Sequence, residues 1–127
     1  MLSTGFSLIE LLISLAIFSI LLSIAYPSYS TYLQHSYRKE AQIALVHAAS
    51  RLENYFVEQN SYVGATLTEL GETAFIAHGK YLLNLVELSE DDYLIEAIPQ
   101  ADQAKDVCGI LSLNASGELK AESVHCF

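Results

Sequence analysis

The residues that could carry chemistry are few, and the most unusual of them is Glu10. It is the single charged residue in the stretch 6–26, FSLIELLISLAIFSILLSIAY. A carboxylate in such a segment costs about 2.5 to 3.5 kcal/mol near the middle of a bilayer, so it is expected to have a partner or a function. The alternative is a glutamate that reaches the headgroups from near the end of a helix.

The other candidates form no catalytic or metal-binding motif. The histidines at positions 35, 47, 78 and 125 show neither an HExxH nor an HxH spacing, and there is no GxSxG, P-loop or GxGxxG. Glu90-Asp91-Asp92 lacks the alternating oxygen ligands of a calcium loop and indicates a solvated turn. Asn114-Ala115-Ser116 matches the glycosylation sequon but is also an ordinary hairpin turn. We expect no enzyme activity, no metal and no cofactor.

Cys108 and Cys126 are the only cysteines, and neither lies in a CxxC or Cys/His pattern typical of zinc. If they are bridged, closing the loop stabilises the folded head by roughly 3 kcal/mol in the chain-entropy model. Two unlinked buried thiols are the alternative. A bridge would indicate an oxidising compartment, which fits a head that lies beyond a membrane-crossing segment.

The stretch 6–26 is long enough to cross a membrane. As an α-helix it would span about 31 Å, the thickness of a bilayer's hydrocarbon core. It is longer than the apolar part of a cleavable signal peptide and has no small-x-small exit. Pro27 follows, where we expect a kink or a local break in the hydrogen-bond ladder.

The segment 27–58 is predicted to continue the helix with one apolar face. Its apolar residues recur at steps of four and three: Ala41, Leu45, Ala48, Leu52, Tyr55 and Phe56. This stripe should pack against a sheet. A coiled-coil seam is the alternative, although the stretch holds few heptads.

The remainder of the chain predicts a connecting loop and a small sheet. Segment 59–79 holds three glycines and indicates a loop, with a short helix conceivable at 66–70. Four β-rich runs follow and predict two antiparallel hairpins: Tyr81–Leu88, Tyr93–Ile98, Ile110–Asn114 and Leu119–Val124. The predicted fold is therefore α+β, a long N-terminal helix packed on a four-stranded antiparallel sheet at 80–127, whose last strand the disulfide ties.

Charge divides the molecule in the same way. The whole net charge of −9 arises after residue 56, whereas residues 1–56 are neutral. An acidic head repels phosphate backbones, and no basic stripe is present, so broad nucleic-acid binding is disfavoured.

Two groups of residues carry a family resemblance. The run Gly5-Phe6-Ser7-Leu8-Ile9-Glu10, with Ala25-Tyr26-Pro27 near the end of the apolar stretch, resembles the N-terminal signature of type IV pilins. Arg38-Lys39-Glu40-Ala41-Gln42, Asn60-Ser61-Tyr62-Val63-Gly64 and the closing Cys126-Phe127 are similar to the E-type minor pilins. One departure is Met1-Leu2-Ser3-Thr4, which has no Lys or Arg where the family's leader is basic. Either the true start lies upstream, or insertion relies on the family machinery.

The resemblance implies how the chain is processed and where it acts. A prepilin peptidase would remove the leader 1–5 by cutting between Gly5 and Phe6, and would methylate the new amino terminus of Phe6. Glu10 would pair with the Phe6 amine of a neighbouring subunit, since opposite charges attract strongly in an apolar bundle. The chain would cross the inner membrane once, with its head in the periplasm, and then join other pilin subunits in an extracellular pilus through the pilus assembly machinery.

The resemblance implies a structural subunit for adhesion, twitching motility or DNA uptake, and two alternatives stand beside it. One is a pseudopilin of a type II secretion system, which shares the N-terminal signature but whose main subunit usually has a calcium loop and lacks the cysteine pair. The other is a minor pilin that acts as a DNA receptor in transformation, which the acidic head disfavours.

Overall fold

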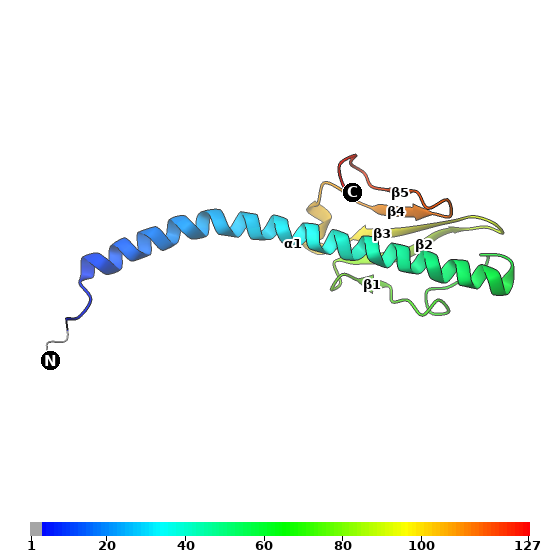
Figure 1. The fold of residues 1–127 in the computed structure, drawn as a ribbon, viewed down its shortest axis with the longest axis horizontal. Coiled ribbons are helices and arrows are strands. Elements are labelled where there is room, and N and C mark those ends of the chain that lie inside the picture. Colours follow the sequence, from blue (N-terminus) through cyan, green and yellow to red (C-terminus); the bar gives the residue numbers. More distant parts are fainter. Residues whose placement is uncertain (1–3) are drawn as a thin grey trace. The chain divides into compact units, whose positions relative to one another are not determined.

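The computed structural model describes residues 4–127 as one long helix and one antiparallel sheet (Figure 1). Met1, Leu2 and Ser3, which belong to the predicted leader, lie outside the described residues. The helix α1 runs from Leu8 to Gln59. The chain divides after Leu33 into two units, which we call the stem, up to Leu33, and the head, Gln34–Phe127.

From Leu8 to Tyr32 the stem is an apolar helix whose side chains are exposed. Its length and composition suit a membrane span, and none of its most apolar window is buried. The hydroxyls of Ser14, Ser19 and Ser23 donate to backbone carbonyls of the preceding turn at 2.7–2.8 Å. Each serine thereby satisfies its polar group within its own helix, as an apolar environment requires.

Pro27 lies inside α1, and the helix passes through it without interruption. The Thr31 hydroxyl donates to the Pro27 carbonyl at 3.1 Å and supports this turn of the helix. The neighbouring turns keep their helical conformation although Pro27 has no N–H to donate to the ladder. The kink or local break in the ladder expected at Pro27 stays a prediction.

The head holds a five-stranded sheet in the order β1-β2-β3-β4-β5, all antiparallel. The bounds are Phe75–Ile76 for β1, Tyr81–Leu88 for β2, Tyr93–Pro99 for β3, Leu111–Asn114 for β4 and Leu119–Lys120 for β5. A 3-10 helix, η1, spans Ala101–Lys105 between β3 and β4. The pairs Leu83↔Ala97 and Ile95↔Leu113 fix the register of the central strands.

The predicted four-stranded sheet is wrong by one strand. The extra strand β1 lies in the segment predicted as a connecting loop and pairs with β2 through Phe75↔Leu82 and Ile76↔Tyr81. The turn between them contains Ala77 and His78, both in the left-handed region with φ of 50° and 56°. Gly79, with φ of 77°, completes this turn, but the two residues before it are not the Asn, Asp or Gly typical of a two-residue hairpin turn, so the signal was weak.

Two smaller predictions also fail. Residues 66–70 form turns, in which the Glu69 carboxylate accepts from the Thr66 N–H and hydroxyl, and no helix. The last strand ends at Lys120 rather than Val124. Beyond it the chain turns back to Cys126, and the Glu122 N–H donates to the Cys108 carbonyl at 3.0 Å. The disulfide loop therefore replaces the second half of the predicted strand.

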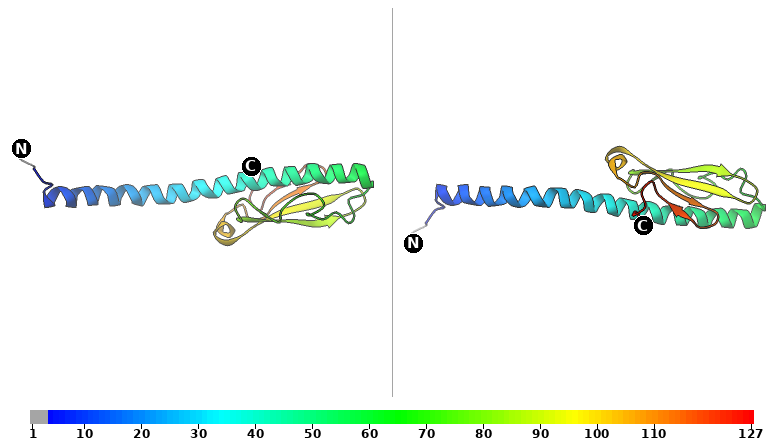
Figure 2. Two further views of the ribbon diagram at one scale, coloured as in Figure 1. Left: turned by 90° about the horizontal axis from the view of Figure 1, so that it is seen from below. Right: turned by 90° about the horizontal axis from the view of Figure 1, so that it is seen from above.

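The core of the head lies between α1 and one face of the sheet, which lies to one side of the helix in Figure 2. Ala41, Leu45, Ala48 and Leu52 are fully buried, and Tyr55 and Phe56 pack against the same core. The sheet contributes Leu83, Ile95 and Leu111. The stripe predicted from the sequence thus packs against the sheet. Burial of each large apolar side chain stabilises the head by about 1.5–3 kcal/mol.

Candidate functional site

The first candidate site is the start of α1. Residues 4–7 precede the helix and are exposed, and among the described residues no atom beyond the chain neighbours of Gly5 lies within 4 Å of the position its side chain would occupy. Phe6 is 85% exposed. The backbone on both sides of the predicted cleavage point is therefore accessible in a non-helical segment.

Glu10 closes the first turn of this helix. Its Oε2 accepts a hydrogen bond from the Ser7 N–H at 2.9 Å. Ser7 and Glu10 have the spacing of a capping box, in which a glutamate three residues into the helix satisfies the N–H of the capping residue. Sequence reasoning missed this contact, although the Ser-x-x-Glu spacing before an apolar run is its recognised signal.

The stem surface beyond Glu10 is shaped for close packing. Leu11, Ser14, Leu15 and Phe18 line a shallow apolar hollow of about 270 Å³. Small residues such as serine let helices approach closely in an apolar environment. Since these side chains are exposed, a lipid or a second helix must cover them.

The second candidate site is a buried polar network in the head. The Arg38 guanidinium binds the Asp106 carboxylate through two hydrogen bonds, Nε to Oδ2 at 2.9 Å and Nη2 to Oδ1 at 2.5 Å. Both residues are only 6% exposed. Such two-point contacts are the strongest class of arginine–carboxylate pair.

Gln103 completes the network from η1. Its Nε2 lies 3.1 Å from the Gln34 carbonyl, 3.1 Å from the Tyr81 hydroxyl and 3.3 Å from Asp106 Oδ2. Burial raises the pKa of Tyr81, and the hydrogen bond from Gln103 acts in the opposite direction. The network therefore joins α1, β2 and η1 at the point where the head begins.

Sequence reasoning missed this network, but one signal pointed to it. The buried stripe of α1 reads 38, 41, 45, 48 and 52, so Arg38 occupies the first position of the apolar face. A charged residue in a core position requires a buried partner of opposite charge. The partner itself was not predictable, because Asp106 lies 68 residues away.

The two cysteines are joined as predicted. Cys108 and Cys126 form a disulfide with a Cα–Cα distance of 5.8 Å, and both are buried. It lies beside the polar network, since the Cys108 N–H donates to Asp106 Oδ1 at 3.4 Å.

Three of the four histidines have separate partners. His47 Nδ1 lies 2.5 Å from Glu72, His78 Nε2 lies 3.7 Å from Glu40, and His35 contacts Arg38. Within residues 4–127, no three His, Cys, Asp or Glu side chains gather in an arrangement that could hold a metal ion.

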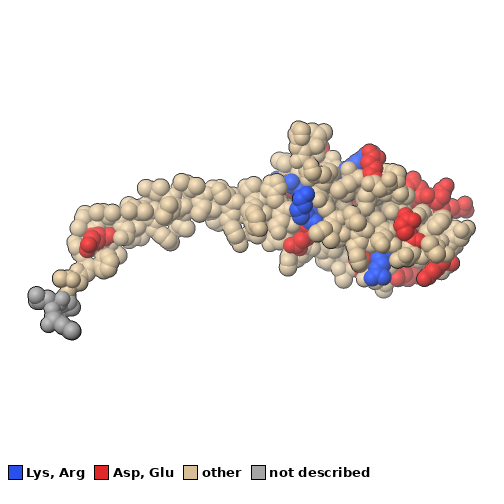
Figure 3. Space-filling view, viewed as in Figure 1, with Lys and Arg blue, Asp and Glu red and all other residues tan. Residues whose placement is uncertain are grey.

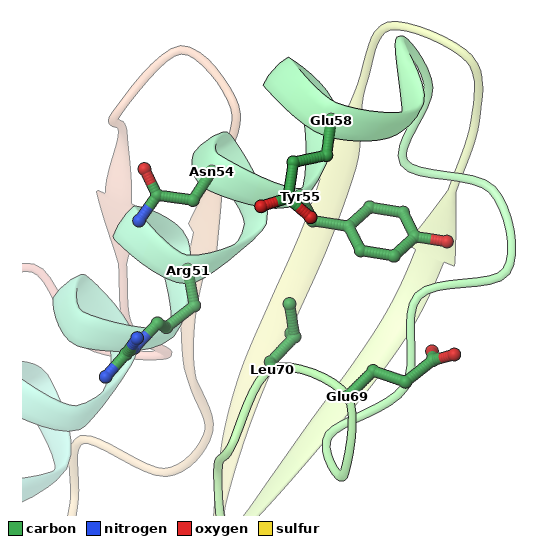
Figure 4. A pocket seen from close by; sticks show the side chains of 6 residues that line it. All are labelled: Arg51, Asn54, Tyr55, Glu58, Glu69 and Leu70. Atoms are coloured by element: carbon green, nitrogen blue, oxygen red, sulfur yellow. The ribbon is translucent and has the colours of Figure 1, made fainter.

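A polar pocket of about 150 Å³ lies between the end of α1 and the following loop. It is lined by Arg51, Asn54, Tyr55, Glu58, Glu69 and Leu70. Figure 4 shows the Arg51 guanidinium and the Glu69 carboxylate on opposite sides of it. These polar groups do not converge on one point, so they do not form a site that could bind one ligand together.

Comparison with known proteins identifies the family. Residues 27–112 match the family described as type IV minor pilin ComP, DNA uptake sequence receptor, and residues 1–26 match the prokaryotic N-terminal methylation motif. The first match covers more than half of the chain.

Two solved structures show the same fold. The non-core minor pilin PilV of Neisseria meningitidis is 18% identical, with a TM-score of 0.60 over 74% of this chain and 91% of that chain. A type IV pilin from Shewanella oneidensis is 23% identical, with a TM-score of 0.57 over 74% of this chain and 97% of that chain. The family match confirms the predicted minor pilin and favours it over the secretion pseudopilin. The chain is a type IV minor pilin and belongs to the ComP minor pilin family.

Proposed function

We propose that this minor pilin is cut between Gly5 and Phe6 by a prepilin peptidase, methylated at Phe6 and assembled through the contact of Glu10 with a neighbouring subunit. The match to the methylation motif over residues 1–26 supports the processing step. So does the exposed, non-helical backbone at 4–7, because a peptidase must bind its substrate in an accessible segment.

The observation that carries the proposal is that Glu10 is the single charged residue of the exposed apolar stretch 6–26. A carboxylate can accept several hydrogen bonds, so the bond from the Ser7 N–H leaves room for an ammonium group. We infer that this group is the Phe6 amine of the next subunit. In a helix bundle that excludes water, such a pair fixes the register of one subunit on the next.

The route to the filament follows from the stem. We propose that the apolar stem first anchors the chain in the inner membrane, with the head in the periplasm, and later enters the filament. The stem suits both places because the surface of 6–26 is apolar apart from Glu10 and a few serines, and the hydroxyls of Ser14, Ser19 and Ser23 are bonded within the helix.

The experiment compares three replacements in full-length chains expressed in piliated cells. Glu10→Val removes both the helix cap and the charge, whereas Glu10→Gln keeps an acceptor for the Ser7 N–H and removes only the charge. Glu58→Val removes an exposed carboxylate at the far end of α1 and serves as control. We expect both Glu10 variants to insert in membranes but to be largely absent from sheared filaments, and the control to be incorporated normally.

Normal incorporation of Glu10→Gln would show that helix capping, rather than charge pairing, is the role of Glu10. Normal incorporation of Glu10→Val would refute both roles.

A second candidate function is DNA reception, favoured by the description of the matched family. We rank DNA reception second because the net negative charge of the head repels the phosphate backbone of DNA. Figure 3 shows acidic groups spread over the visible face of the head with few basic groups among them. Lys80 pairs with Asp102 at 2.5 Å, Lys120 pairs with Glu118 at 3.1 Å, and Arg38 is buried. Three of the six Lys and Arg residues are thus already engaged.

A DNA titration of the full chain in detergent micelles, at two salt concentrations, tests this ranking. We expect a dissociation constant weaker than micromolar at physiological salt. Sub-micromolar binding that weakens steeply as salt rises would reverse the ranking, because it would reveal several phosphate contacts.

A further inference from the structure

Two side chains on one face of α1 hold the two ends of the disulfide loop. Arg38 binds Asp106, which lies just before Cys108. Gln42, one turn further along α1, donates from Nε2 to the Cys126 carbonyl at 3.4 Å. Residues four apart lie one above the other on a helix, so both contacts are made by the same face.

These contacts and the disulfide form a closed ring. From Arg38 the ring passes to Asp106, then through the hydrogen bond of the Cys108 N–H to Asp106 Oδ1 at 3.4 Å. It crosses the disulfide to Cys126 and returns to α1 at Gln42. Figures 1 and 2 show the C-terminus beside α1, in agreement with this last contact.

We propose that α1 is the template on which the Cys108–Cys126 disulfide closes, and that the closed disulfide in return locks α1 onto the head. Arg38 and Gln42 act as positioning residues: Arg38 holds Cys108 through Asp106, and Gln42 holds the backbone carbonyl of Cys126. The two cysteines are then held 5.8 Å apart between their Cα atoms only while α1 is docked. Whatever docking adds to the stability of the disulfide, the disulfide adds to docking.

Closure is an oxidation by thiol–disulfide exchange. The thiolate of one cysteine attacks the disulfide of an oxidised protein or small-molecule donor and forms a mixed disulfide. The thiolate of the second cysteine then displaces the donor. The two cysteines together lose two electrons and two protons, and the two sulfur atoms of the donor disulfide end as thiols. The finished bridge is buried, which shields it from the reverse reaction.

The consequence is a redox-controlled clasp at the beginning of the head. In the reduced chain, only the noncovalent contacts of the ring and the apolar stripe hold this part of α1 on the sheet. In the oxidised chain the ring is closed covalently on one side, so Asp106 and the Cys126 carbonyl cannot move apart. Oxidation therefore commits the first turns of α1 in the head to their docked position.

The test measures the dithiol–disulfide equilibrium constant of the full chain in detergent micelles with glutathione buffers, read by thiol alkylation and mass spectrometry. We expect Arg38→Met to lower this constant about tenfold and Gln42→Ala about threefold, as coupled neighbours do. Two control variants change residues outside the ring. Lys80→Met removes a cation that pairs with Asp102 of η1, and Ile95→Val destabilises the hydrophobic core. Both controls should keep the constant of the parent chain.

The same measurement in concentrated urea shows whether the differences arise from the docked helix or from the substitutions themselves. All variants should share one dithiol–disulfide equilibrium constant once α1 is undocked. If Arg38→Met does not fold, Gln42→Ala decides, since it removes one hydrogen bond at a half-buried position. The proposal is overturned if the folded Gln42→Ala chain keeps the parent's constant. It is also overturned if Ile95→Val lowers the constant as much as the ring variants do.

Discussion

Replacement of Arg38 by methionine should destabilise the head more than replacement of any exposed charged residue. The substitution keeps the volume of the side chain but leaves the Asp106 carboxylate buried at 6% exposure without its cation. An uncompensated buried charge costs far more than the intact pair contributes, because the remaining group has lost both water and its partner.

The expected cost follows from what Asp106 keeps. Breaking a buried pair costs about 3–5 kcal/mol. Asp106 still accepts from Gln103 Nε2 at 3.3 Å and from the Cys108 N–H at 3.4 Å, so we expect a value at the lower end, about 3 kcal/mol. For a domain of this size the midpoint of thermal unfolding should fall by about 12–24 °C.

The assay is thermal and chemical unfolding of the full chain in detergent micelles, followed by circular dichroism. Arg51→Met is the matched control, because it removes the same charge from an exposed position on α1, and it should change stability by less than about 0.5 kcal/mol. The double variant Arg38→Met/Asp106→Leu should recover most of the loss, since an apolar pair leaves no buried charge. Equal stability of Arg38→Met and Arg51→Met would refute the reasoning.

Three further predictions concern the core, the disulfide and the buried tyrosines. Leu45→Ala should cost about 2–5 kcal/mol, whereas exposed Ile43→Ala on the same helix should cost almost nothing; similar values by denaturant unfolding would contradict the packing of the stripe on the sheet. Cys126→Ser should lower stability by about 3 kcal/mol and abolish the effect of reductant, and a parent chain indifferent to reductant would count against the bridge. Burial, aided by the Glu53 carboxylate, raises the pKa of Tyr93 from 10.0 to about 12. The contribution of the neutral Tyr93 hydroxyl to the free energy of unfolding is therefore present below pH 10 and is lost as the pH rises from 10 to 12. Tyr93→Phe should therefore unfold at higher pH than the parent in an alkaline titration read at 295 nm, and an identical midpoint would exclude this cause.

Periodicity predicted the elements that depend on repeated burial. The stripe from Ala41 to Leu52 and the strand Tyr81–Leu88 appear at the predicted positions, because alternation and helical spacing reflect burial directly. The strand β1 was missed because it is two residues long and shows no alternating pattern of its own. Pairing with β2, rather than its own pattern, makes it a strand.

The two candidate sites differ in how far apart their residues lie along the sequence, and this decides whether the sequence could predict them. The Ser7–Glu10 contact is local, and its spacing was present in the sequence. The Arg38–Asp106 contact is not local, and only the position of Arg38 in the apolar register indicated that a partner must exist. Which acidic residue meets it is decided by the path of η1 over the helix, a property of the folded head.

The most direct test of the account is mass spectrometry of this subunit in sheared surface filaments. The account predicts a mature chain that begins at Phe6, carries one added methyl group on its amino terminus and contains the Cys108–Cys126 disulfide. A filament subunit that still carries Gly5, or the recovery of Glu10→Val in filaments at the level of the native chain, would contradict it.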